Sequence, residues 1–217
     1  MSRKGIPLLF LVSLLCLFVF SCADRDAAPT KDSVGPVADE SERLEEEIGR
    51  SSELRELIAI RDELAARAIA RNVTPEQIRE TAGDVDGSNA LLGLTPDEAR
   101  ARFDRIDALV DALFERYPAL ADIAVREEAH LPVCDADGIA LAWEHYSKVL
   151  PAAFGQGAAL VQGAPARPPL TCKTTQLVVG FALCALKSGG AASLYFVCSY
   201  GVFCSACDGG LADIICP

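Results

Sequence analysis

Six cysteines crowd into the last 46 residues of this 217-residue chain, and they constrain its fold more than any other feature. A density of about 13% is typical of small domains whose disulfides compensate for a limited core. The same stretch carries only four charged residues, which cancel, whereas the preceding section is strongly acidic. We therefore expect a cysteine-rich apolar module over residues 171–217, with disulfides formed by Cys172, Cys184, Cys198, Cys204, Cys207 and Cys216.

Zinc binding is the alternative use of these thiols. The module contains one Cys-x-x-Cys pair, Cys204 and Cys207, but it has no second such pair and no histidine. Structural zinc sites are usually built from two paired knuckles. The signal-like first 22 residues predict export, and an exported protein meets an oxidising environment that favours disulfides. We therefore predict disulfides, no metal site and no cofactor.

Two uncharged stretches, residues 174–186 and 188–207, are separated by Lys187, and the second opens with a Ser-Gly-Gly turn signal. Both are longer than most strands and are apolar around their whole circumference. This favours a hairpin of two helices over two strands, although both stretches include residues with strand propensity. A helix that is apolar on every side must be buried or lie in lipid. We expect the exposed face of the predicted hairpin to contact either the acidic section or a membrane.

The hairpin narrows the 15 pairings that six cysteines allow. Cys172 and Cys207 are equally distant from a turn centred within the Gly-Gly step, so antiparallel helices bring them level. Cys184 and Cys198 are offset by three residues, or about 4.5 Å along the axis. A disulfide tolerates this offset because its Cα atoms need only lie within about 7 Å. Cys204 is then expected to pair with Cys216 across the Gly209-Gly210 turn. The predicted pairs are Cys172–Cys207, Cys184–Cys198 and Cys204–Cys216.

The first 22 residues have the features of a signal peptide. Two basic residues precede an apolar run over residues 6–20. The run is shorter than the roughly 20 residues of a spanning helix and matches a signal-peptide core. It leads into Ser21-Cys22, which resembles the lipobox of bacterial lipoproteins and implies lipidation of Cys22. Ordinary cleavage after Ala23 and a retained anchor are the alternatives. We expect an exported protein, either anchored at the cell envelope as a lipoprotein or secreted.

Composition divides the rest of the chain. Residues 23–40 are polar and lack a hydrophobic period, as expected of a flexible tether. Residues 151–170 are rich in Pro, Gly and Ala, which suits a linker or a processing segment. Between them, residues 41–150 are expected to form an acidic helical domain. The predicted fold class is all-α: a small acidic helical bundle followed by a disulfide-stapled apolar helical hairpin.

Helix signals are clear in the acidic section. An apolar stripe predicts a helix from Ser41 or Ser52 to Arg71. Thr74 and Thr95 each precede a proline and lie three residues before Gln or Glu, which is the pattern of a capping box. The helix after Thr95 is expected to bury a stripe formed by Phe103, Ile106, Val110, Leu113 and Tyr117. Further expectations are a turn over residues 83–89 and helices over residues 119–128 and 139–150.

The acidic section contains no catalytic constellation. Residues 84–87 and 135–138 resemble calcium loops, but the glycine and the final carboxylate of an EF-hand are not at the required positions, so we interpret both as Asp-Gly turns. The only histidines, His130 and His145, lack a spacing that would pair them with Cys134 for nucleophilic catalysis. We predict a non-enzymatic protein. Cys134 is left over from the predicted pairing, either as a free thiol or as a competitor for one of the six.

The layout resembles two groups of exported proteins. Phe203-Cys204-Ser205-Ala206-Cys207 and the Cys-, Gly-, Ala- and Leu-rich stretches around it are similar to cysteine-rich bacteriocin precursors of the halocin C8 type, over about 46 residues. This chain has fewer cysteines than that family, at different spacings. The resemblance implies that the N-terminal part confers immunity and that the C-terminal peptide is released. Fulvocin C-related lipoproteins share the plan of exported leader, helical middle and cysteine-rich end.

Two functions follow from these features. As a bacteriocin-like precursor, the chain would release residues 171–217 to act on membranes, while the acidic part masks them or gives immunity. As an alternative, it is a non-enzymatic surface lipoprotein of unknown binding role with a stapled C-terminal domain. The excess of acidic residues argues against nucleic acid as a partner. The expected partner is a membrane, through the lipid anchor and, in the bacteriocin-like reading, through the apolar module. The identity of a protein partner is unknown.

Overall fold

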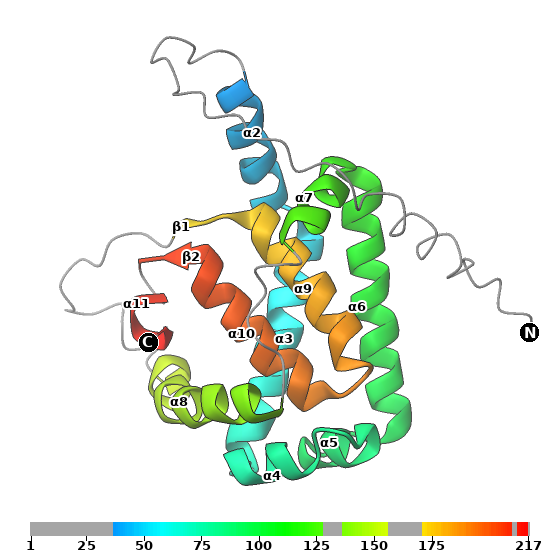
Figure 1. Cartoon of the computed structure of the whole chain (residues 1–217), viewed down its shortest axis with the longest axis vertical. Helices are drawn as coiled ribbons and strands as arrows, with labels where there is room; N and C mark the ends of the chain where they lie inside the picture. The colour runs from blue at the N-terminus through cyan, green and yellow to red at the C-terminus, as the bar shows by residue number, and fades with distance from the viewer. Residues whose placement is uncertain (1–36, 128–135, 156–170, 210–211, 217) are drawn as a thin grey trace, which may run out of the picture. The chain divides into compact units, whose positions relative to one another are not determined.

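The computed structural model (Figure 1) describes residues 37–127, 136–155, 171–209 and 212–216. Most of these residues are helical, and the predicted all-α fold is confirmed. The elements in chain order are α2 (Val37–Gly49), α3 (Ser52–Ala70), α4 (Pro75–Glu80), α5 (Val85–Leu91), α6 (Pro96–Arg116), α7 (Ala119–Glu127), α8 (Ala136–Gly155), β1 (Thr171–Cys172), α9 (Thr174–Ser188), α10 (Ala192–Ala206), β2 (Cys207–Asp208) and α11 (Ala212–Ile215).

Side-chain caps start several helices of the acidic section. Thr74 and Thr95 each form the predicted capping box, because the hydroxyl accepts from the backbone N–H three residues later and that residue's side chain accepts from the Thr N–H. Ser51 caps α3 by accepting from the N–H of Leu54 at 3.2 Å. The stretch that was expected to start at Ser41 or Ser52 is therefore two helices, α2 and α3, separated at Ser51.

Three boundaries differ from the sequence-based expectations. The segment predicted as a turn, residues 83–89, contributes to helix α5, because the Asp84 carboxylate accepts from the N–H of Gly87 at 3.0 Å and caps the helix. Helix α2 begins at Val37, inside the predicted tether. Helix α8 runs through Pro151 to Gly155, inside the predicted linker.

Helices α9 and α10 form the hairpin that the two uncharged stretches predict. Gly189 and Gly190 join them with φ values of 57° and 95°, a backbone region that favours glycine. At the open end of the hairpin, β1 and β2 form an antiparallel bridge that places Cys172 opposite Cys207. The helices approach closely, since a Cβ built on Gly180 would lie 2.2 Å from Cγ1 of Val202.

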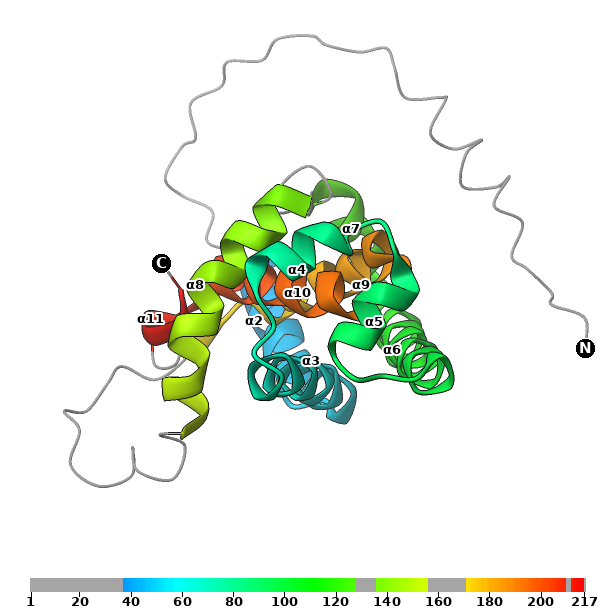
Figure 2. The ribbon, with the colours of Figure 1, turned by 90° about the horizontal axis from the view of Figure 1, so that it is seen from below.

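The hairpin lies at the centre of the unit Val37–Pro217, and the acidic-section helices surround it (Figures 1 and 2). Helices α3, α5 and α8 pack on α10, while α2, α6 and α7 pack on α9. The apolar surface of the hairpin therefore meets the acidic section. Of the predicted α6 stripe, Ile106 and Leu113 are fully buried, and the remaining members are partly buried against the same core.

Candidate functional site: the interface between the acidic helices and the cysteine hairpin

Three disulfides cross-link residues 171–217, and their pairs are the predicted ones. Two of them join the two sides of the hairpin, and the third joins α10 to the residue that follows α11. The Cα atoms are 4.1 Å apart in the first pair, 5.7 Å in the second and 5.3 Å in the third, which lie within the range of native disulfides or just below it. All six cysteines of residues 171–217 bond to one another, so no disulfide joins the hairpin to the acidic helices. The pairs are Cys172–Cys207, Cys184–Cys198 and Cys204–Cys216.

Neither hairpin helix has a capping side chain of its own. The N-cap residues are Lys173 for α9 and Ala191 for α10, and neither makes a side-chain capping bond. The first N–H groups of a helix have no partner within it and carry its positive dipole end. Both helix starts therefore need acceptors from elsewhere, and acidic-section residues supply them.

Glu45 of α2 supplies the acceptor at the start of α9. Its carboxylate accepts from the backbone N–H of Thr175 at 3.1 Å and from the hydroxyl of Thr174 at 2.7 Å. The Thr175 hydroxyl donates to the other carboxylate oxygen, and Thr174 also bonds to the Glu45 carbonyl. A negative charge at a helix N-terminus is stabilising, so Glu45 acts as an N-cap supplied from another part of the chain.

Ser88 and Asn89 of α5 supply the acceptors at the start of α10. The Asn89 side-chain oxygen accepts from the N–H of Ala192 at 2.9 Å, and its amide nitrogen donates to the carbonyl of Gly190 at 3.2 Å. The Ser88 hydroxyl accepts from the N–H of Ser193 at 3.2 Å, and the two serine hydroxyls lie 2.6 Å apart. Ser88 and Asn89 are both buried, so these bonds form away from solvent.

Arg61 of α3 meets both hairpin helices between these two ends. Its side chain is only 2% exposed, and its guanidinium carbon lies 4.4 Å from the ring centroid of Tyr200, 4.9 Å from that of Phe203 and 5.9 Å from that of Phe181. Asp62 pairs with it at 2.7 Å. A desolvated cation stacked on aromatic rings gains about 2 kcal/mol, which offsets part of the cost of burying its charge.

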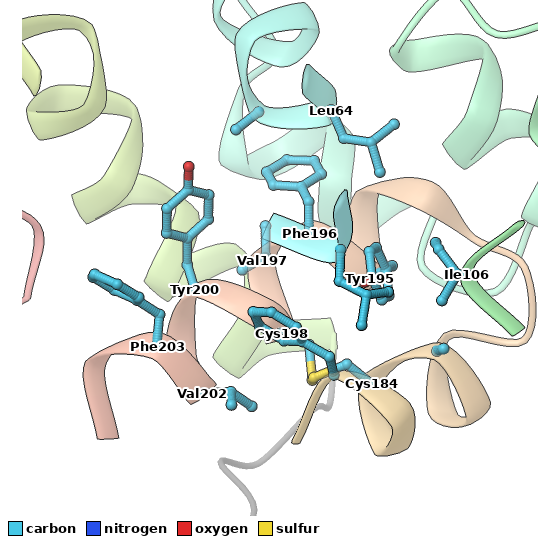
Figure 3. Close-up of a cluster of buried hydrophobic side chains, with 14 of the residues drawn as sticks. Leu64, Ile106, Cys184, Tyr195, Phe196, Val197, Cys198, Tyr200, Val202 and Phe203 are labelled. Carbon is cyan, nitrogen blue, oxygen red and sulfur yellow. A yellow bond between two sulfur atoms is a disulfide. The ribbon is translucent and has the colours of Figure 1, made fainter. Parts of the chain in front are cut away.

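The aromatic side chains of α10 point in different directions and contact different neighbours. Figure 3 shows Tyr200 and Phe203 on one side, Phe196 beside Leu64, and Tyr195 on the side of Ile106. The Tyr200 hydroxyl donates to Asp62 at 2.8 Å, and burial raises the pKa of the Tyr200 phenol. Burial likewise raises the pKa of Tyr195, whose hydroxyl has no hydrogen-bond partner among the described residues. These phenols are therefore neutral packing groups at neutral pH.

Cys22, the predicted lipidation site, lies outside the described residues. His130 and Cys134, for which no catalytic role is predicted, lie outside them as well. The side chain of His145 lies on α8, where Nε2 is 2.8 Å from the carbonyl oxygen of Ile215 and the ring stacks edge-on against Tyr146. His145 thus contacts the C-terminal helix α11 as a packing residue.

Sequence reasoning missed all four interface residues. Glu45, Ser88 and Asn89 lie more than 100 positions from their partners, and no local pattern marks such contacts. Arg61 left a visible signal, because it falls four residues after Leu57 and three before Leu64 on the buried stripe of α3. A charged residue on an otherwise apolar helix face predicts that its side chain is buried and paired with other side chains, rather than exposed to solvent.

Comparisons with protein-family models, with curated proteins and with solved structures found no match to this chain. Within the part of the chain that the structure describes, no three His, Cys, Asp or Glu side chains gather as a set of metal ligands. None of the described helices combines the length and the hydropathy needed to cross a membrane.

Proposed function

We propose that the chain is an exported bacteriocin-like precursor in which the acidic helices mask the cysteine hairpin, and that the hairpin acts on membranes once it is released. The closure of all three disulfides within residues 171–217 carries this proposal. A single cut within residues 156–170 would separate two pieces that share no covalent bond. The hairpin would keep its cross-links, and the acidic helices would hold it only by non-covalent contacts.

The apolar surface that the acidic helices cover supports an action on membranes. Tyr195, Phe196 and Tyr200 of α10 are fully buried, and the helix carries no charged residue. Burial of each such side chain contributes about 1.5–3 kcal/mol of stabilising free energy. This contribution is lost if the hairpin separates from the acidic helices and its side chains become exposed to water. A bilayer interface offers a released apolar hairpin another place to bury this surface.

Vesicle leakage tests the proposal. A specific protease site is placed within residues 156–170 of the full chain, the oxidised protein is cut, and the hairpin is separated in denaturant without reductant. The oxidised hairpin is expected to release dye from lipid vesicles, whereas the uncut protein releases none. Reduced and alkylated hairpin is the control for disulfide dependence. Absence of leakage with the oxidised hairpin at micromolar concentration would contradict membrane action.

The proposed lipid anchor has its own test. If Cys22 carries the lipid, Cys22→Ala will leave the protein uncleaved or release it from the membrane fraction, because the modified thiol is gone. Metabolic labelling with palmitate measures this directly. If the variant incorporates as much palmitate as the protein that retains Cys22, lipidation at Cys22 is contradicted and secretion by ordinary cleavage is favoured.

The surface-lipoprotein alternative is favoured by a different observation, the central position of the hairpin in the unit Val37–Pro217. If the hairpin serves only as the core of an envelope protein, it never leaves the acidic helices. Mass spectrometry of the native protein separates the two functions. One intact lipidated chain supports the lipoprotein, whereas a separate fragment of about 46 residues supports the precursor.

A further inference from the structure

We infer that the acidic helices recognise the hairpin in its disulfide-bonded form, by capping the N-termini of both its helices, and that they do not hold the reduced peptide. The inference rests on the proposed function in treating the hairpin as a separable ligand. It adds the chemical form of that ligand and the residues that recognise it. Glu45 contacts the start of α9, and Asn89 with Ser88 contacts the start of α10.

The two capping sites lie at opposite ends of the hairpin. Because α9 and α10 are antiparallel, α9 starts at the open end and α10 starts at the Gly189–Gly190 turn. A helix of 15 residues is about 22 Å long, so the two caps are separated by roughly that distance. Arg61 contacts both helices between them. Only a hairpin with its helices in this register presents both N-termini to the acidic helices at once.

Two disulfides fix the register of the two helices whose N-termini are capped. Cys172–Cys207 directly precedes α9, and beside it the N–H of Lys173 donates to the carbonyl of Ala206 at 2.8 Å. Cys184–Cys198 joins the two helices in their half nearer the turn. Isolated helices of 15 residues are marginal in water, and these two have no side-chain caps of their own. Reduction therefore removes the cross-links that hold the two N-termini in position.

The experiment measures retention of the hairpin in the full chain after a cut. The protein with a protease site within residues 156–170 is cut while oxidised, and bound hairpin is quantified by gel filtration over a dilution series, with and without a dithiol reductant. We expect the oxidised hairpin to stay bound and the reduced peptide to bind at least tenfold more weakly. Equal retention of both forms, within about threefold, would overturn the inference.

Variants of α2 separate capping from general charge attraction. Glu45→Ala is expected to weaken retention about two- to thirtyfold, the effect of losing one N-cap. Glu45→Gln keeps an acceptor oxygen and is expected to retain most of the binding. Glu47→Ala is the matched control, because Glu47 is exposed on the same helix. Equal weakening by Glu45→Ala and Glu47→Ala, or by Glu45→Ala and Glu45→Gln, would contradict capping.

Asn89→Ala tests the other end of the hairpin by the same measurement, with a similar expected loss. Circular dichroism before the cut shows whether each variant is folded, so a loss of retention is assigned only to folded proteins. The outcome is independent of membrane action. A hairpin that permeabilises vesicles but is held equally in both redox forms contradicts this inference alone, and a selectively held hairpin without vesicle activity contradicts the proposed function alone.

Discussion

The hairpin and the acidic helices are stabilised by different means. Four of the acidic helices, α3, α4, α5 and α6, begin after Ser51, Thr74, Asp84 and Thr95, each of which caps its own helix. Ion pairs join α3 to α6 along the surface. The hairpin has neither kind of contact within itself, and it depends on three disulfides, on burial, and on caps supplied by the acidic helices.

The difference shows which residues determine the structure of each region. Local sequence specifies where the acidic helices begin, whereas covalent cross-links and distant residues specify the hairpin. The acidic helices nevertheless need the hairpin, because their buried faces pack on it. The helix starts of the acidic section are thus specified by neighbouring residues, whereas those of the hairpin are specified by residues far away in the sequence.

Reduction of the disulfides is expected to have the largest effect. Each disulfide contributes about 2–4 kcal/mol by restricting the unfolded chain. Denaturant unfolding with and without reductant measures the total, and hydrogen exchange shows where protection is lost. We expect α9 and α10 to lose protection first, while the starts of α3 and α6 keep theirs. Simultaneous loss in all four helices would mean that the two regions are not distinct in stability.

Replacement of Arg61 tests the contact shared by both regions. Arg61→Ala is expected to lower the free energy of unfolding by about 2–5 kcal/mol, because it leaves a cavity against three aromatic rings. Arg61→Met fills the space with an apolar side chain and is expected to be close to neutral. If Arg61→Met costs as much as Arg61→Ala, the charge itself is the stabilising feature. Urea unfolding provides both values.

Gly180→Ala tests the close approach within the hairpin. The added methyl would meet the Val202 side chain at 2.2 Å, and a β-branched side chain has little freedom to move aside. We expect a loss of about 1–3 kcal/mol in thermal or urea unfolding. Gly180→Ala combined with Val202→Ala should recover part of that loss. A double variant that is less stable than Gly180→Ala would show that the clash is not the cause.

Thr95→Ala tests local encoding in the acidic section. It removes the hydroxyl that accepts from the N–H of Glu98 at 3.2 Å, and loss of an N-cap costs about 0.5–2 kcal/mol. Thr95→Ser keeps the hydroxyl and is the control. The loss should appear in urea unfolding without a change in hairpin retention after the cut. A matching loss of retention would show that this cap is coupled to the interface.

Acid titration is expected to give the smallest effect. The hydrogen bond from Arg105 lowers the pKa of Glu56 below its usual value. A carboxylate whose pKa is lower in the folded state stabilises the fold above its unfolded pKa, and this contribution disappears as the pH falls through its folded pKa. Unfolding measured between neutral pH and acid should therefore show slightly less loss in Arg105→Gln. An unchanged pH profile would mean that this exposed pair contributes nothing.

The sequence predicted the features that depend on short spacing. Capping boxes at Thr74 and Thr95 and the two apolar hairpin helices needed only neighbouring residues. The start of α5 was missed because Asp84 precedes a Gly-containing stretch typical of a turn, and tertiary contacts of Ser88 and Asn89 with α10 favour the helix. The capping of α9 and α10 could not be predicted, because it joins segments whose proximity only the folded chain determines.

The central position of α9 and α10 has a consequence for the order in which the protein folds. Chains are synthesised from the N-terminus, so the acidic helices emerge before the residues that fill their centre. Until α10 follows, their apolar faces remain exposed, and such intermediates are prone to aggregate. Contacts between early and late segments also slow folding. The core can therefore form only after α9 and α10 have been synthesised. A chain truncated before Thr174 would lack the surface on which the acidic helices pack.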